Sequence, residues 1–127
     1  MKAKATHENG ILSSIKLDCN EDEIAFLSTF LQGIIAAGKI PAKIELETYT
    51  LIGLYDRYYK TFSIINKPRK IKLSPAEFIA LERLLMAAPI ADQYTAMLRN
   101  GIIGGLASIA WQGRQPQINY LKANAIF

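Results

Sequence analysis

The chain has 127 residues, of which half are hydrophobic and a fifth are charged, a composition typical of a folded globular domain and not of a disordered or fibrous protein. Its net charge of +4 comes from 15 basic and 11 acidic residues, a small excess whose placement matters more than its size. Apolar runs fall well short of the roughly 20 residues that a membrane-spanning helix needs, and the single cysteine excludes an intrachain disulfide. We therefore expect one domain, residues 1–127, in a cytoplasmic protein that does not bind membranes.

The first ten residues contain an Asn-Gly turn signal but no apolar segment of the kind that a secretory signal needs, so we expect residues 1–10 to be a mobile tail. The next segment, "ILSSIKL" at 11–17, carries the β-branched residues Ile11 and Ile15 directly after that turn. This combination predicts a short strand over 11–17.

A first helix is predicted directly after that strand. Asp18 stands three residues before Glu21, which is the spacing of a capping box, and acids in the first turn favour the positive end of the helix dipole. Gly38 is a suitable stop for this helix. Its apolar side chains recur every three or four residues, at Ile24, Leu27, Leu31, Ile34 and Ile35.

A second helical period covers residues 43–64 and is rich in aromatic side chains. Lys67-Pro68 lies beyond its end, because proline disfavours a helical conformation in the residue before it. The apolar positions of this period are Leu51, Tyr55, Tyr58, Tyr59 and Phe62.

The stretch "RKIKL" at 69–73 alternates charged and apolar residues, which predicts a half-buried strand. Ser74 and Glu77 then have the spacing of a capping box, with Pro75 at the first helical position. These residues predict the start of a third helix, which Pro89 ends.

From 90 to 111 the apolar residues again follow a helical period, interrupted by three glycines. Each glycine costs about 1 kcal/mol relative to alanine inside a helix. We therefore expect a long, kinked helix in which Gly101 and Gly105, four residues apart, allow close packing. Pro116 is expected to lie beyond its end, and "QINYL" at 117–121 reads as a short terminal strand.

Two stretches of the chain share one order of elements. "IKL" at 15–17 and "IKL" at 71–73 each precede a capping sequence and an amphipathic helix, and a second helix follows each. We predict a predominantly helical α+β domain with about four helices and two or three short strands. Residues 11–66 and 67–112 would be a strand–helix–helix duplication, followed by a strand at 117–121. The alternative is that unrelated segments use similar capping sequences.

The sequence offers no constellation of catalytic residues. His7 is the only histidine, so Cys19 has no histidine partner to activate it as a nucleophile. The acidic residues at 18–23 lack the alternating ligands and central glycine of a calcium loop. The glycine-rich "NGIIGG" at 100–105 is neither a dinucleotide fingerprint nor a P-loop. We predict a non-catalytic protein that holds no cofactor and no metal.

One stretch, residues 57–72, concentrates basic side chains next to aromatic ones. Cations bind phosphate and flat rings stack on bases, so this stretch predicts a weak, sequence-tolerant nucleic-acid site. Its basic residues are Arg57, Lys60, Lys67, Arg69, Lys70 and Lys72. The structural alternative is that the aromatic residues form a buried helix face, while Lys70 and Lys72 protect the edge of a strand.

The carboxyl-terminal residues are unusually apolar and predict docking, either on this chain's own core or on a second copy. The leading functional prediction is therefore a non-catalytic interaction or assembly module that forms homo-oligomers. Nucleic-acid binding is the second prediction, and a small-molecule cavity lined by Tyr55, Tyr58 and Tyr59 is the third. The residues predicted to contribute to self-association are Gly101, Gly105, Tyr120, Leu121, Ile126 and Phe127.

Overall fold

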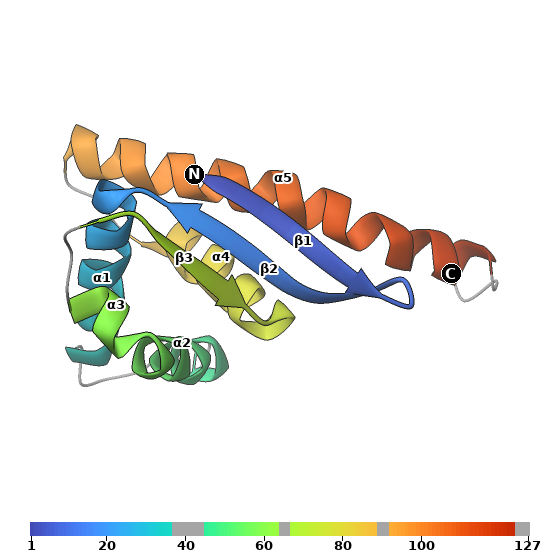
Figure 1. Ribbon diagram of the computed structural model, residues 1–127, viewed down its shortest axis with the longest axis horizontal. Helices are drawn as coiled ribbons and strands as arrows, with labels where there is room; N and C mark the ends of the chain where they lie inside the picture. The colour runs from blue at the N-terminus through green and yellow to red at the C-terminus, as the bar shows by residue number, and fades with distance from the viewer. Residues whose placement is uncertain (37–44, 64–66, 89–91, 124–127) are drawn as a thin grey trace.

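The computed structural model describes residues 1–36, 45–63, 67–88 and 92–123, with side chains described as far as Ile109. Helices cover one side of an antiparallel sheet with the strand order β1-β2-β3 (Figure 1). The predicted fold class, a predominantly helical α+β domain, is confirmed. The elements in chain order are β1 (Lys2–Glu8), β2 (Ile11–Cys19), α1 (Glu21–Ala36), α2 (Glu45–Arg57), α3 (Tyr59–Ser63), β3 (Arg69–Leu73), α4 (Pro75–Ala87) and α5 (Gln93–Ala123).

The amino-terminal segment is a strand, so the expectation of a mobile tail over 1–10 is wrong. Lys2–Glu8 forms β1 and pairs antiparallel with β2, with a shift of register between Thr6 and His7. Asn9 (φ 54°) and Gly10 (φ 77°) join the two strands, and both adopt the left-handed backbone conformation. Such an Asn-Gly turn matches the twist of the flanking strands, which explains why the chain reverses here.

The pairing of β2 with β3 brings the two Ile-Lys-Leu triplets together. Because they run antiparallel, the triplets are related by a local twofold axis at their middle residues. The opposing pairs are Ile15 with Leu73, Lys16 with Lys72 and Leu17 with Ile71. Two series of described elements, β2-α1-α2 and β3-α4-α5, follow the predicted strand–helix–helix order, with α3 an additional short helix. Duplication of an ancestral unit stays a prediction.

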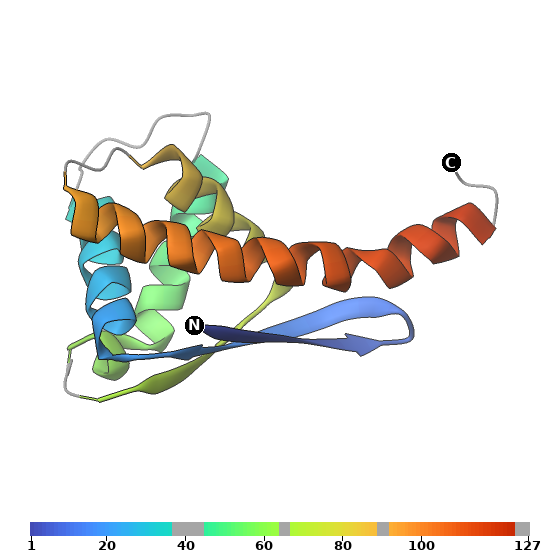
Figure 2. The ribbon, with the colours of Figure 1, turned by 90° about the horizontal axis from the view of Figure 1, so that it is seen from above.

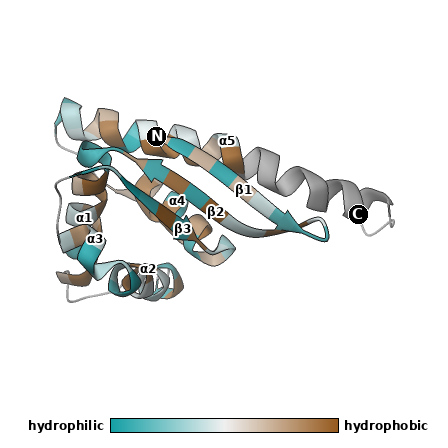
Figure 3. Cartoon of the chain, in the orientation of Figure 1, coloured by the Kyte–Doolittle hydropathy of each residue, from teal (hydrophilic) through white to brown (hydrophobic). Residues whose placement is uncertain are grey.

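The sheet buries one face against the helices. The isoleucine and leucine side chains of both triplets are at most 1% exposed, and hydrophobic and hydrophilic residues alternate along β1 and β2 in Figure 3. Burying one such side chain contributes roughly 1.5–3 kcal/mol, so this core holds the two layers together. The helices contribute Ile24, Leu27, Leu31, Leu51, Phe78, Leu81, Leu85, Ile102 and Leu106.

Both helices that directly follow β2 and β3 begin at capping boxes. In α4, Ser74 Oγ accepts a bond from the Glu77 N–H at 3.2 Å, and the Glu77 carboxylate accepts one from the Ser74 N–H at 2.8 Å. In α1, Asn20 and Glu23 exchange the same two bonds, both at 2.9 Å. The box predicted for α1 two residues earlier is wrong, because Asp18 still belongs to β2.

The predicted helix over 43–64 is divided within its described part into α2 and α3. Tyr58 lies between them, although its N–H still bonds to the Leu54 carbonyl at 3.1 Å. The buried hydroxyl of Ser28 donates to the Phe62 carbonyl at 2.7 Å and so connects α1 to α3. This junction places the side chains of Arg57 and Tyr58 beside β3.

The last helix passes through all three glycines, as expected, but it continues across 117–121, so the predicted terminal strand is wrong. A strand needs a neighbour for its backbone hydrogen bonds, whereas a helix satisfies them internally. A Cβ at Gly105 would lie 2.8 Å from Met1 Cε, whereas Gly101 and Gly104 have nothing within 4 Å of that position. The close packing predicted at Gly101 is therefore absent from the described part of the chain.

We expect Gly101→Ala to raise the free energy of unfolding by about 0.5–1 kcal/mol, because alanine is the better helix former and the site is open. Urea denaturation at low protein concentration measures the change. Gly10→Ala is the matched control and should lower the free energy of unfolding, because its φ of 77° strains any side chain. A destabilised Gly101→Ala variant would contradict the prediction.

Candidate nucleic-acid interface

Lysines cover the outer side of the sheet, opposite the helices. Alternate residues of the strands face this side, and Figure 2 shows the helices lying on the other side of the sheet. We call the following six exposed residues the lysine face: Lys2, Lys4, Lys16, Asp18, Lys70 and Lys72.

The strand register arranges the lysine face in two rows across the sheet. The first row, from β1 to β3, is Lys4, Lys16 and Lys72. The second row is Lys2, Asp18 and Lys70. Neighbouring strands lie about 4.8 Å apart, and residues two positions apart along a strand lie about 6.8 Å apart. The six side chains therefore start from an area of about 10 Å by 7 Å.

This arrangement of charge is unfavourable for folding. Like charges directly opposite one another destabilise a sheet, and Lys16 has a lysine opposite it on each side. Five lysines and one aspartate give the face a formal charge of +4, which equals the net charge of the whole chain. The remaining ten basic and ten acidic residues cancel. The lysine face is thus a positively charged surface on the described sheet.

An open hollow of about 550 Å³ lies on this surface, lined by four of the five lysines and by Asp18. Its other lining residues are Ala3 and Leu17, so no aromatic ring borders it within the described chain. The hollow offers ammonium groups that bind phosphate but no ring on which a base could stack.

The six basic residues predicted as a nucleic-acid site are only partly brought together. Lys70 and Lys72 belong to the lysine face, but Arg69, which precedes them, alternates to the other side of β3 and is half-buried. Lys60 is exposed on α3 and Lys67 is exposed before β3, and neither belongs to the two rows. The sequence interpretation also missed three residues of the face: Lys2, Lys4 and Lys16.

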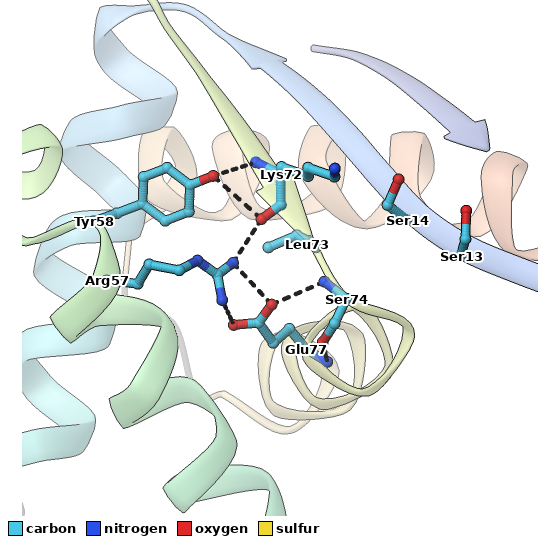
Figure 4. A pocket seen from close by; sticks show the side chains of 8 residues that line it. All are labelled: Ser13, Ser14, Arg57, Tyr58, Lys72, Leu73, Ser74 and Glu77. Carbon is cyan, nitrogen blue, oxygen red and sulfur yellow. Dashed lines mark hydrogen bonds and ion pairs between the residues drawn. The ribbon is translucent and has the colours of Figure 1, made fainter.

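The sixth basic residue, Arg57, instead covers the outer edge of β3 together with Tyr58 (Figure 4). Its guanidinium donates to the Glu77 carboxylate at 2.8 and 2.9 Å and to the Lys72 carbonyl at 2.7 Å. The Tyr58 hydroxyl accepts from the Lys72 N–H at 2.8 Å and donates to its carbonyl at 3.3 Å. Since both backbone groups of Lys72 are engaged, this part of the edge cannot pair with a further strand.

Glu77 is a carboxylate that is only 6% exposed. Burial raises its pKa, but hydrogen bonds from Arg57 and from the Ser74 backbone outweigh burial and leave the pKa below its usual value. Glu23, at the equivalent position of α1, is also 6% exposed and lies 3.2 Å from the amino group of Met1. Both α1 and α4 therefore begin at a buried glutamate that is paired with a cation.

The three tyrosines predicted to line a cavity pack mainly in an aromatic cluster. Tyr55 stacks on Phe62 with 5.6 Å between ring centroids, and Tyr59 meets Tyr55 edge-on at 6.0 Å. Of the three, Tyr58 alone lines one of the hollows found in the described structure, the one of about 320 Å³ in Figure 4. Small-molecule binding by this group stays a prediction.

The only cysteine is 1% exposed, and burial together with the charge of Glu23 raises the pKa of the Cys19 thiol to about 12. The thiol is therefore protonated at neutral pH. Across the described ranges, no three His, Cys, Asp or Glu side chains are placed to bind a metal ion. The described helices also include none that is long and apolar enough to cross a membrane.

The residues predicted for self-association lie mostly beyond the described side chains. Gly101 is exposed and Gly105 is half-buried against Met1. Tyr120 and Leu121 belong to α5 by their backbone, while 126–127 lie outside the described residues. Their role in self-association stays a prediction.

Comparison of the chain with protein-family models, with curated proteins and with solved structures found no match. Its function is therefore inferred from the described residues alone.

We expect Lys16→Glu to raise the free energy of unfolding by roughly 0.5–1 kcal/mol at low salt, because two repulsive cross-strand pairs become attractive. Urea denaturation at 20 mM and at 1 M sodium chloride measures this gain, which should shrink at high salt. Lys60→Glu makes the same change of charge away from the lysine face and is the control. A loss of stability in Lys16→Glu but not in Lys60→Glu would show that repulsion among Lys4, Lys16 and Lys72 does not destabilise the fold.

We expect Arg57→Ala to lower the free energy of unfolding at pH 7 by about 1–2 kcal/mol, because it leaves the buried Glu77 carboxylate without its cation. The loss is limited because the Arg57 guanidinium is half-exposed and water can take over part of its interaction. The pKa of Glu77 is lower in the folded protein than in the unfolded chain. The stabilisation by the Arg57–Glu77 pair is therefore fully present above the pKa of the unfolded chain and is lost as the pH falls through the pKa of the folded protein.

Denaturation of Arg57→Ala and of the parent from pH 7 to pH 3 measures this effect. Their difference should be largest at neutral pH and should narrow below pH 4.5, the ordinary value for glutamate. Arg83→Ala, which removes a more exposed ion pair with Glu47, should have the smaller effect. A difference that is constant with pH would assign the loss to packing.

Proposed function

We propose that this chain is a non-catalytic nucleic-acid-binding protein whose lysine face docks on the phosphate backbone. The basis of the proposal is the row Lys4, Lys16 and Lys72, in which exposed lysines oppose each other and no acid intervenes. A polyanion relieves this repulsion and gains free energy by releasing its condensed counterions. We also propose that the protein acts in the cytoplasm.

The size of the face suits a short stretch of backbone. Double-stranded DNA carries one negative charge per ~1.7 Å of its axis. A lysine face of about 10 Å by 7 Å, extended by flexible side chains, would contact about three or four phosphates. Binding of this kind is weak, with dissociation constants of roughly 1–100 μM at physiological salt.

The chemistry of the face favours contacts that do not depend on sequence. Reading a base needs a side chain that forms paired hydrogen bonds with its edge, or a ring that stacks on it. The lysine face has no arginine, asparagine, glutamine or aromatic residue among its six members. Affinity should therefore follow the charge density of the nucleic acid.

Anionic membranes are the competing ligand for such a surface. Proteins that lie on a membrane commonly insert apolar side chains beside their cations, and all six members of the lysine face are charged. This composition favours nucleic acid. Self-association, the leading prediction from the sequence, is compatible with this proposal. The lysine face consists of side chains on one face of the sheet, whereas a further strand would pair with the backbone at an edge.

We expect a fluorescently labelled 20-base-pair duplex to bind with an affinity that falls linearly with salt on a log–log plot, with a slope of about −3. Anisotropy titrations between 20 and 200 mM sodium chloride measure the slope. Replacing Lys4 and Lys16 by alanine should bring the slope to about −1, because each lost phosphate contact removes about 0.9. Replacing Lys60 and Lys67 by alanine removes the same charge away from the two rows and should leave the slope nearly unchanged.

Absence of binding at 20 mM salt would overturn the proposal. Equal losses in the two double variants would show that net charge alone, and not the lysine face, is responsible. Vesicles with and without 30% phosphatidylserine serve as a second ligand. Binding to the anionic vesicles but not to the duplex would move the proposed function to membrane surfaces.

A further inference from the structure

The two edges of the sheet differ in how their outward backbone groups are engaged. On β3 the outward backbone groups of Lys72 are bonded to Tyr58 and Arg57. On β1 no hydrogen bond from another element of the described chain reaches the backbone of Ala3 or Ala5. In Figure 2, which looks onto the β1 side, α5 runs beside this strand and does not lie over it.

The hydrogen bonds of Tyr58 also show which backbone N–H and C=O groups of β1 point away from the sheet. Because the Lys72 N–H and C=O face away from β2, the opposing Lys16 directs its own groups towards β1 and bonds there with Lys4. Backbone groups alternate along a strand. The N–H and C=O of Ala3 and Ala5 therefore point away from the sheet and are available to another strand.

We propose that a second copy of this chain pairs with β1 through its own β1, antiparallel and centred on Ala5. Each Ala5 N–H would donate to the Ala5 carbonyl of the other copy, across a twofold axis perpendicular to the sheet. Such an isologous contact uses the same strand on both subunits. The product is one continuous antiparallel sheet with β3 at each outer edge.

The charges of β1 select this register. Centring on Ala5 places Lys2 opposite Glu8 of the second copy and Lys4 opposite Thr6, so each end of the strand forms an attractive pair. A shift of two residues towards the amino terminus would place Lys4 opposite Lys4 of the second copy. That register brings together two like charges and is disfavoured.

The approach of a second copy would bring its α5 close to α5 of the first. This helix packs on the inner side of β1, so its symmetry mate would lie close to it, on the same side of the joined sheet. Packed helices need about 8–10 Å between their axes, and the smallest separations require small residues. The exposed positions of α5 include Gly101, Gly104, Ala107 and Ser108.

This inference does not depend on nucleic-acid binding, but it would extend the proposed site. The twofold axis keeps both lysine faces on the same side of the joined sheet, so that ten lysines would form one surface. The tests below contain no nucleic acid, so their failure is distinguishable from failure of the proposed function.

Cysteine cross-linking tests the register. In the proposed pair, the two Ala5 Cα atoms lie about 5.5 Å apart, which a disulfide can span. Ala5→Cys should therefore form a covalent dimer on mild oxidation, seen on a non-reducing gel. Ala3→Cys, on the same strand and the same half-buried face, is the matched control. It should not form the covalent dimer, because Ala3 would face residue 7 of the second copy and not the other Ala3. The native Cys19 is buried and should not interfere.

Sedimentation equilibrium of the unmodified chain between 1 and 300 μM provides the second measurement. We expect a mass that rises from 14.1 kDa towards twice that value, and Glu8→Lys should weaken association at least fivefold. The exchange Lys2→Glu with Glu8→Lys should restore it, while Asp56→Lys, an exposed change of the same sign elsewhere, should have little effect.

A monomer at 300 μM would overturn the proposal and leave the edge of β1 to a strand of another protein. Cross-linking of Ala3→Cys as readily as Ala5→Cys would overturn the register. A dimer that is insensitive to both charge variants would place the contact elsewhere on the molecule.

Discussion

The antiparallel pairing of the two Ile-Lys-Leu triplets determines what this protein buries and what it presents to solvent. Side chains alternate between the faces of a sheet, so the register that sends Ile15 and Leu73 inward also sends Lys16 and Lys72 outward. A slip by one residue would exchange the two sets and bury lysines in an apolar core. The core therefore enforces a cross-strand repulsion that the strands alone would avoid.

Two buried glutamates attach the helices to this sheet. Glu23 and Glu77 each close a capping box directly after β2 or β3, and each has a cation beside it. A carboxylate at a helix amino terminus is stabilised by the unbonded N–H groups and by the helix dipole. The two cations come from unrelated places, the amino group of Met1 and the side chain of Arg57. The two helix starts are thus alike in geometry but depend on different parts of the chain.

Local signals in the sequence were sufficient for some elements. Ser74, Pro75 and Glu77 combine an N-cap, a favoured first residue and a capping glutamate, and β3 and the start of α4 lie where they were predicted. The strand β1 was missed because the apolar positions of "KAKATHE" are Ala3 and Ala5, which offer little hydrophobic contrast and are buried only because α5 packs on them.

The lysine face could not be read from the sequence for a related reason. Its members come from three strands, and only the register shows that Lys4, Lys16 and Lys72 share a row. A search for neighbouring charges along the chain instead grouped Lys72 with Arg57, whose guanidinium is engaged by Glu77. The reading of 117–121 as a strand failed because five alternating residues are compatible with a helix when no strand lies beside them.

The difference between the two edges of the sheet has a consequence for the size of any assembly. Tyr58 and Arg57 occupy the outward hydrogen-bonding groups of Lys72 on β3, so the addition of a strand is hindered at that border. In the proposed dimer both outer edges are β3 edges, at which the backbone of Lys72 is already engaged, and further growth would be hindered. A sheet with two free borders could elongate without limit into a fibril. Because the Tyr58 hydroxyl and the Arg57 guanidinium engage the backbone of β3, they would limit the size of the assembly.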